Sequence, residues 1–205
     1  REEISEYYTN AGFKYCLYQE GGESIDGYGN SVINVKNSNG IITQSIFTID
    51  SHAYAGTGLS SILAMDYDNI KQSQVDWYKN RVEKNNKYNS NLIASLDNKD
   101  ELLEKHGKIN TLLFFHIPLQ EYKDAWLEYV NNNYQDTENV KLIYGTAGET
   151  GDVVYCGTEP DNLFETMQAL GGKHGMFCGH DHVNNFSIEY QGIRLTYGLS
   201  IDYLA

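Results

Sequence analysis

The chain has 205 residues, of which 40% are hydrophobic and 21% are charged, as in ordinary globular proteins. This length suits one domain, residues 1–205, with a sizeable core. The formal net charge of −13 argues against a nucleic-acid groove and against binding to an anionic membrane, because both need clustered Lys and Arg. No apolar run approaches the roughly 18 residues that a membrane-spanning helix needs.

Three cysteines, Cys16, Cys156 and Cys178, are too few and too scattered for a disulfide framework or a zinc knuckle. A bridge between Cys16 and Cys156 stays open. The chain begins at Arg1 without Met, so we interpret its N-terminus as cut or processed. The sequence therefore predicts a soluble protein and leaves both a cytoplasmic and a secreted location open.

The hydrophobic pattern predicts helices and strands that alternate along the chain. After a helix that ends near residue 9, strands are expected at 13–18, 31–35, 41–49, 111–115, 176–178, 186–190 and 193–197. Helices are expected at 74–87, with Ser73 as N-cap, and at 99–106, 121–131 and 162–170. Loops are expected at 53–69, 89–98 and 132–157. This alternation, with antiparallel hairpins at both ends, indicates an α/β fold with mixed sheets.

Two histidines follow directly after an apolar strand near the end of the chain. Residues 176–178 are apolar, Gly179 ends the run, and His180 and His182 come next. On an extended chain, residues two apart point to the same side, so both rings can reach one metal centre. Gly179 lets the backbone turn and approach the site closely.

A second apolar strand, residues 112–115, ends at His116. Two buried strands that deliver histidines at their carboxyl ends are typical of a hydrolytic metal site at the edge of a sheet. The alternative is that these are core histidines bonded to nearby backbone, and three rings from two strand ends favour metal over that alternative. His106 and His174 stand alone, and we expect both at the surface.

The same stretches resemble a known family. Residues 179–186, Gly-His-Asp-His-Val-Asn-Asn-Phe, resemble the closing motif of calcineurin-like metallophosphoesterases, in particular of their purple-acid-phosphatase-related branch. Residues 115–122 resemble the motif before it. Stretches at 27–30, 49–51 and 70–77 match in the family's order, so the resemblance covers nearly the whole chain.

The resemblance implies a sandwich of two mixed β-sheets flanked by helices, of which this chain would be the C-terminal part. It also implies a dinuclear centre of divalent or trivalent Fe, Mn, Zn or Co that hydrolyses phosphate esters. Carried over, His116 and His180 would bind one ion and His182 the other. The family's bridging Asp, Asn ligand and catalytic His have no counterpart here, so no catalytic residue is predicted within this chain.

Two formal matches to the missing motifs are not assigned to metal. The first is Asp50-Ser51-His52, which aligns with a strand end, and the second is Gly151-Asp152, which follows no apolar strand. Beside the site, Asp181 is expected to point away from the metal, with the orientation of a ligand ring as an alternative role. Asn184 is expected to shape the turn.

We therefore predict a metallophosphoesterase whose partners are a phosphate-ester substrate and the missing N-terminal portion of the same protein. This chain alone would hold metal partially or not at all, and an exposed sheet edge would allow it to dimerise. A competing hypothesis is a non-catalytic module that binds metal, or binds a partner through its acidic, Tyr-rich surface. A third is a mononuclear zinc hydrolase built on the three histidines, for which the sequence nominates no general base. The sequence does not choose the substrate.

Overall fold

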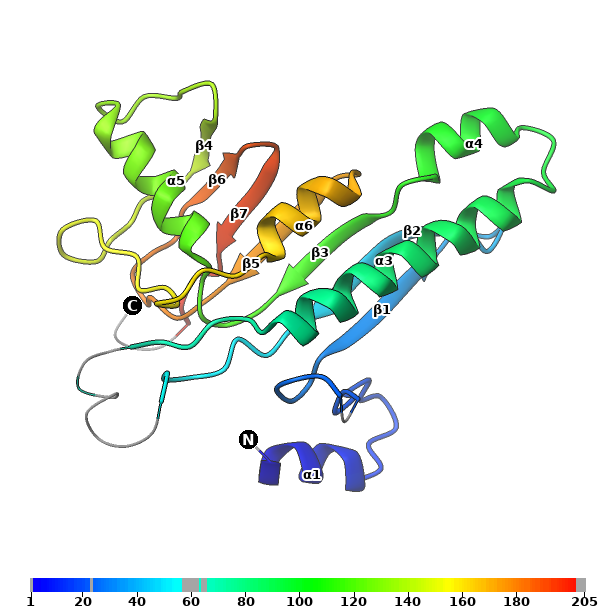
Figure 1. The fold of residues 1–205 in the computed structure, drawn as a ribbon, viewed down its shortest axis with the longest axis horizontal. Helices are drawn as coiled ribbons and strands as arrows, with labels where there is room; N and C mark the ends of the chain where they lie inside the picture. The colour runs from blue at the N-terminus through cyan, green and yellow to red at the C-terminus, as the bar shows by residue number, and fades with distance from the viewer. Residues whose placement is uncertain (1, 23, 57–62, 64–65, 202–205) are drawn as a thin grey trace.

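A seven-stranded mixed sheet flanked by helices organises the chain (Figure 1). The computed structural model describes residues 2–22, 24–56, 63 and 66–201. The elements follow in the order α1 (Glu2–Asn10), β1 (Ser31–Lys36), β2 (Ile42–Thr48), α3 (Gln72–Ile93), α4 (Lys99–His106), β3 (Asn110–Phe114), α5 (Gln120–Asn131), β4 (Val140–Tyr144), α6 (Leu163–Leu170), β5 (His174–Cys178), β6 (Ser187–Tyr190) and β7 (Ile193–Tyr197). The predicted α/β class is thereby confirmed.

The strand order is β1-β2-β3-β5-β7-β6-β4. Strands β2, β3, β5 and β7 run parallel to one another, while β1, β6 and β4 pair antiparallel with their neighbours. The carboxyl ends of the four parallel strands therefore meet at one edge of the sheet. Loops at such an edge are the usual place for a ligand site in an open α/β sheet.

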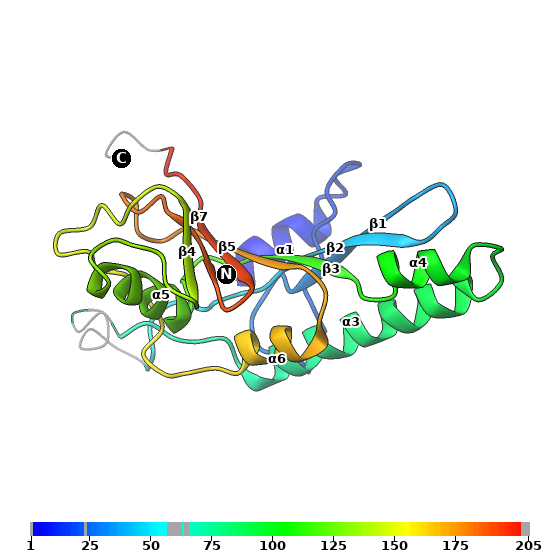
Figure 2. The same ribbon diagram turned by 90° about the horizontal axis from the view of Figure 1, so that it is seen from above.

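One face of the sheet carries the hydrophobic core. Cross-strand neighbours form a continuous row on this face, and each is fully buried: Phe47, Leu113, Met176, Leu195 and Ile188. Helices α3, α5 and α6 lie on this side of the sheet (Figure 2). The core residues of these helices include Tyr78, Trp126 and Met167.

The other face carries a second apolar row that the described residues leave partly exposed. Its members alternate with the core residues along the same strands: Ile33, Val35, Ile46, Leu112, Phe114 and Phe177. Ile33, Val35 and Phe114 are 39–44% exposed, and the rings of Phe114 and Phe177 stack at 4.8 Å. We call this set the open face.

Helix α3 continues beyond its expected end at residue 87 as far as Ile93, through the first half of the stretch 89–98 that was expected to be a loop. Asn89 explains the difference, because its buried side-chain amide accepts a bond from the Ile42 N–H and donates to the Ile42 and His106 carbonyl groups. These tertiary bonds stabilise a polar helix end that has little apolar periodicity. The expected N-cap, Ser73, is inside the helix and donates instead to Asp26 Oδ2.

Two further sequence expectations were wrong. Residues 13–18 form no strand, because the chain turns at Cys16, whose N–H donates to the Phe13 carbonyl. The expected loop at 132–157 contains β4, an edge strand that pairs only with β6 and keeps Ile143 and Tyr144 exposed. Nearly half of the loop expected at 53–69 lies outside the described residues, and Tyr54 and Tyr67 form an isolated bridge across it.

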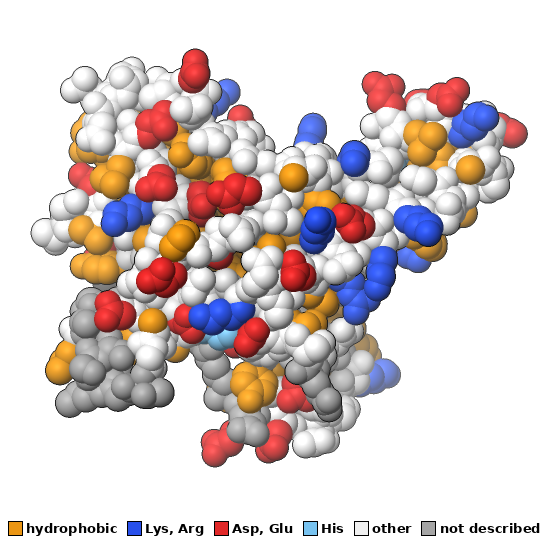
Figure 3. All heavy atoms as spheres, in the orientation of Figure 1, with side chains coloured by type: hydrophobic (Ala, Val, Ile, Leu, Met, Phe, Trp, Pro, Cys, Tyr) orange, Lys and Arg blue, Asp and Glu red, His pale blue; other side chains and the backbone are white. Residues whose placement is uncertain are grey.

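The surface on the helix side carries both acidic and basic side chains, which are distributed differently. Asp and Glu side chains are spread across this whole side of the molecule, whereas many of the Lys and Arg side chains lie over α3 and α4 (Figure 3). Within the described part of the chain, no helix combines the length and the apolar character needed to cross a bilayer.

Candidate metal centre

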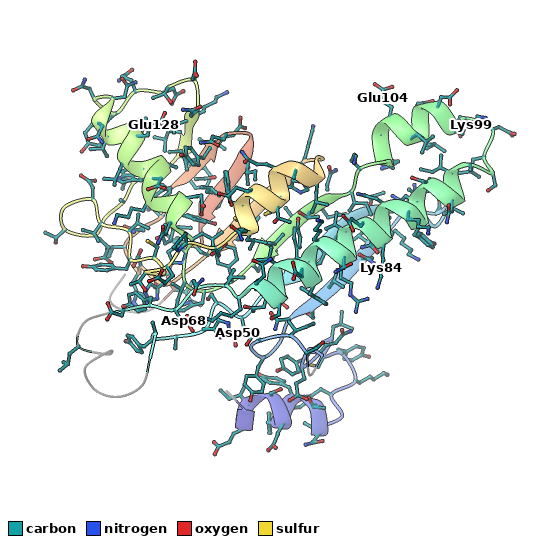
Figure 4. All side chains as sticks on the ribbon, viewed as in Figure 1. Asp50, Asp68, Lys84, Lys99, Glu104 and Glu128 are labelled. Atoms are coloured by element: carbon teal, nitrogen blue, oxygen red, sulfur yellow. The ribbon has the colours of Figure 1, made fainter. Side chains whose placement is uncertain are left out.

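The three predicted ligands lie at the edge of the sheet where the parallel strands end. His116 follows β3, while His180 and His182 follow β5, which pairs with β3 in the sheet. All three line one cavity of about 380 Å³, together with residues 198–201 after β7. Asp50 and Asp68 lie towards this end of the molecule, far from Lys84, Lys99 and Glu104 on α3 and α4 (Figure 4).

His116 and His180 face each other directly. The distance from His116 Nε2 to His180 Nδ1 is 3.4 Å, and the two rings are perpendicular with centroids 5.2 Å apart. Two nitrogens bound to one tetrahedral Zn²⁺, each at about 2.0–2.1 Å, lie about 3.3 Å from one another. The pair therefore has the separation of two ligands of one ion.

His182 lies beside this pair but not on the extended chain that the sequence predicted. After β5 the chain forms a turn, in which His180 has a φ of 75° and the Asp181 N–H donates to the Gly179 carbonyl at 3.0 Å. The extended-chain argument was thus wrong, because the turn and not strand alternation sets the positions of the rings. Among the described residues, no three His, Cys, Asp or Glu side chains converge into a complete metal site.

The environment of His180 favours a neutral ring. Burial, and then the nearby His116 and His182, lower the pKa of His180 to about 4. A neutral imidazole is the form of histidine that binds a metal. The donor set of the cavity, imidazole nitrogens with one ring held neutral, is of a kind that suits a transition-metal ion.

Two small residues determine how His116 sits. Ser51 is buried, and its Oγ accepts bonds from the N–H groups of His116 at 3.1 Å and of Ile117 at 2.8 Å. On the other side, a Cβ added to Gly179 would lie 3.4 Å from His116 Nδ1. The His116 ring thus lies close to the place where a side chain at Gly179 would begin, while the predicted approach of Gly179 to a bound metal stays a prediction.

The Asp50-Ser51-His52 stretch was not assigned to metal. It contacts the site through Ser51, whose Oγ accepts a bond from the backbone of His116. Gln74 joins it to α3: the His52 ring lies 3.0 Å from Gln74 Oε1, and Gln74 Nε2 donates to the Asp50 carbonyl and to Asn30. The sequence did not reveal this role, because the contact between Ser51 and His116 exists only once β2 and β3 are neighbours.

Asp181 and Asn184 connect the histidine turn to the long loop before α6. Asp181 is buried with its carboxylate turned inward, where it accepts bonds from Tyr197 Oη at 2.6 Å, Asn184 Nδ2 and the Tyr155 N–H. Asn184 Oδ1 accepts from the N–H groups of Gly148 and Glu149. The Asn184 side chain therefore bonds the backbone of a distant loop, and not the nearby backbone that the sequence predicted; within its own turn it donates to the Asp181 carboxylate.

Tyr67 is a neighbour of the site that sequence reasoning missed. Its ring packs edge-on against the His180 ring with centroids 4.4 Å apart, and it stacks on Tyr54 at 5.4 Å. Tyr67 precedes the helix motif at 70–77 without a distinguishing pattern. No signal in the sequence places it beside a histidine more than a hundred residues later.

The remaining candidates lie away from the three rings or take other roles. Asp152 accepts a bond from Tyr134 Oη. His174 was expected at the surface but is buried at the start of β5, where it bonds Thr111 Oγ1 and the Gly171 carbonyl, and burial lowers its pKa. The glycines on both sides of His174 gave no apolar pattern, so the sequence did not predict that β5 begins at this residue. Cys16, Cys156 and Cys178 are all free.

Comparison with curated proteins finds relatives along nearly the whole chain. "Probable inactive purple acid phosphatase 29" of Arabidopsis thaliana is 29% identical over 187 residues, which are 91% of this chain and 42% of that protein. "Probable inactive purple acid phosphatase 28" and "Probable inactive purple acid phosphatase 14" of the same plant are 23% and 26% identical, over 88% and 91% of this chain.

The chain spans about two fifths of the length of these curated relatives. No family model and no solved structure matches it. The relatives nevertheless confirm the resemblance that the motifs indicated: the chain is similar to proteins named as probable inactive purple acid phosphatases.

Proposed function

We propose that this chain is the C-terminal part of a metal-dependent phosphoesterase and supplies part of its dinuclear metal centre. The observation that carries the proposal is the facing pair of His116 and His180, 3.4 Å apart at the carboxyl ends of adjacent parallel strands. When bound, the metal ions would polarise a phosphate ester and activate water to attack the phosphorus.

Each residue of the site has a distinct task in this proposal. His116 and His180 bind one ion, and His182, which lines the same cavity, contributes to the second. Ser51 fixes the backbone of His116 through its two accepted bonds. Asp181 keeps the histidine turn in place through its bonds to Tyr197 and to the Tyr155 N–H.

We further propose that the rest of the centre comes from an upstream portion of the same protein. The curated relatives are more than twice as long as the matched region. A protein of that length would have enough additional residues to provide the remaining metal ligands. The open face gives this portion a place to pack, because exposed apolar patches of this kind mark interaction surfaces.

Metal retention and hydrolysis test the proposal together. The 205-residue chain should bind Zn²⁺ or Mn²⁺ weakly, should lose this binding in His116→Ala, and should hydrolyse p-nitrophenyl phosphate only at the background rate. The full-length protein should hold two ions and turn the ester over. Turnover by the 205 residues alone that His116→Ala abolishes would contradict the proposed division of the centre.

A second candidate is a non-catalytic module of the same fold that binds a metal or a partner. The word "inactive" in the names of all three relatives favours it. Metal analysis separates the candidates. A dinuclear centre in the full-length protein supports the enzyme, whereas a folded, metal-free protein supports the module.

A further inference from the structure

A cavity beside α3 is separate from the histidine site. It has a volume of about 480 Å³ and lies between α3 and the loop at residues 24–25. The α3 residues of its lining are Ser73, Asp76, Trp77, Asn80, Arg81 and Lys84. None of these residues is among those that line the cavity of His116 and His180. Any ligand here would therefore occupy a second site.

One end of this cavity is fixed by hydrogen bonds between the loop and the helix. Ser73 Oγ donates to Asp26 Oδ2 at 2.6 Å and accepts a bond from the Asp26 N–H at 3.0 Å. This reciprocal pair ties the loop that follows Ile25 to the first turn of α3. The two walls of the cavity are thus held together without a ligand.

Two cations at the other end have no partner in the protein. Arg81 and Lys84 are both exposed, and within the described part of the chain neither side chain makes an ion pair or a hydrogen bond. They are three residues apart on one helix, so they project to the same side. A guanidinium beside an ammonium suits a phosphate group. The net charge of −13 argues against a nucleic-acid polymer, which needs many more cations.

Trp77 supplies a flat surface between the two ends. Its ring is partly buried, packs edge-on against Phe47 with centroids 5.6 Å apart, and also borders the cavity. A tryptophan at a cavity wall is a stacking platform for a planar ring such as a nucleobase. Asp76 and Asn80 offer a carboxylate and an amide to polar groups at the edge of such a ring.

We propose that this cavity binds a purine nucleoside monophosphate, with the base on Trp77 and the phosphate at Arg81 and Lys84. From Asp76 to Lys84 the helix rises by about 12 Å, which is enough for base, sugar and phosphate in line. Asp76 favours this ligand over a bare phosphate, because a carboxylate repels an anion but accepts an N–H of the base. The proposal does not rest on the proposed function, since it uses no metal and none of the three histidines.

Fluorescence of the 205-residue chain with adenosine monophosphate (AMP) tests this site, in EDTA to keep metal off the histidines. Of the two tryptophans, Trp126 is 1% exposed, so a ligand reaches Trp77. AMP should quench part of the tryptophan fluorescence, and Trp77→Phe should lose this quenching. Ribose 5-phosphate, which lacks the base, should not quench. Adenosine, which lacks the phosphate, should need a concentration about ten-fold higher than AMP for the same quenching.

Charge-removing variants locate the phosphate. In equilibrium dialysis, Arg81→Gln and Lys84→Gln should each raise the dissociation constant of AMP about five- to ten-fold. Lys87→Gln, a matched change at an exposed position of α3 outside the lining, should keep it within about two-fold. Absent quenching by AMP, equal binding of AMP and ribose 5-phosphate, or equal effects of the three variants would overturn the proposal.

The outcome is separable from that of the proposed function. Metal retention that depends on His116, combined with no binding of AMP, would remove the nucleotide site and keep the phosphoesterase proposal. Binding of AMP that depends on Arg81 and Lys84, in a chain that retains no metal, would support the nucleotide site alone.

Discussion

The two faces of the sheet are built from alternate residues of the same strands, yet they meet different surroundings. Phe47, Leu113 and Met176 are fully buried under α3, α5 and α6, while their neighbours along the strands, including Leu112 and Phe114, form the open face. Strands that are apolar on both sides are typical of parallel sheets covered on both faces. The described residues therefore leave an apolar sheet face open, and the proposed upstream portion would cover it.

Adjacent leucines in β3 give the largest expected contrast between the faces. Leu113→Ala should lower the free energy of unfolding by about 2–5 kcal/mol, because it leaves a cavity in the covered core. Leu112→Ala, one residue earlier on the open face, should cost about 1 kcal/mol or less. Urea unfolding measures both, and equal losses would contradict the difference between the faces.

A smaller effect is expected at Glu121, on the first turn of α5. Burial, with Asp161, Glu165 and Asp124 nearby, raises the pKa of Glu121 to about 7. A carboxyl with a raised folded-state pKa is stabilising at acid pH and loses this contribution as the pH rises from about 4.5 to about 7. Glu121→Gln should therefore raise the melting temperature at pH 8 by about 2–4 °C, which corresponds to a gain of ~1 kcal/mol.

Scanning calorimetry across pH 4–8 tests the sign of this prediction. The advantage of Glu121→Gln should shrink as the pH falls and should vanish near pH 4.5. Glu83→Gln, at an exposed position of α3, serves as the matched control and should show no such trend. If Glu121→Gln is less stable than the parent chain at pH 8, the ionised Glu121 carboxylate does not destabilise the folded protein, and the prediction is contradicted.

On the open face itself, only a small effect on stability is expected at each site. The double change Phe114→Thr and Phe177→Thr should alter the free energy of unfolding by less than about 1 kcal/mol per site, because neither ring is fully covered. It should, however, reduce binding of a hydrophobic dye and self-association in sedimentation. Tyr15→Thr removes an exposed ring outside the sheet and should leave both unchanged. Undiminished dye binding in the double variant would mean that the open face is not the apolar surface we describe.

Sequence reasoning predicted those parts of the fold and site that depend on local pattern. The apolar runs before His116 and His180 gave two central strands, and the shared strand-end position of the histidines predicted that they meet. The strands predicted at 186–190 and 193–197 form the expected hairpin, and the two residues between them, Gln191 and Gly192, both have positive φ, as such a short turn requires.

The parts that sequence reasoning missed depend on contacts between distant segments. The extension of α3 needs the bonds of Asn89 to Ile42, and edge strand β4 needs β6 as its partner. The contacts of Ser51 with His116 and of Tyr67 with His180 join residues at least 65 positions apart. None of these has a periodic signal in its own stretch, so only the assembled sheet reveals them.

The central claim, that the rings of His116 and His180 form part of one metal site, is tested most directly by NMR of histidine-labelled protein. Zn²⁺ titration should shift the imidazole nitrogen signals of His116 and His180 together at the same metal concentration and leave half-buried His106 on α4 unchanged. Either His116→Ala or His180→Ala should abolish the shift of the other ring. If Zn²⁺ shifts neither ring, or if one ring still responds fully when the other is removed, the two histidines do not share an ion and the proposed metal centre is contradicted.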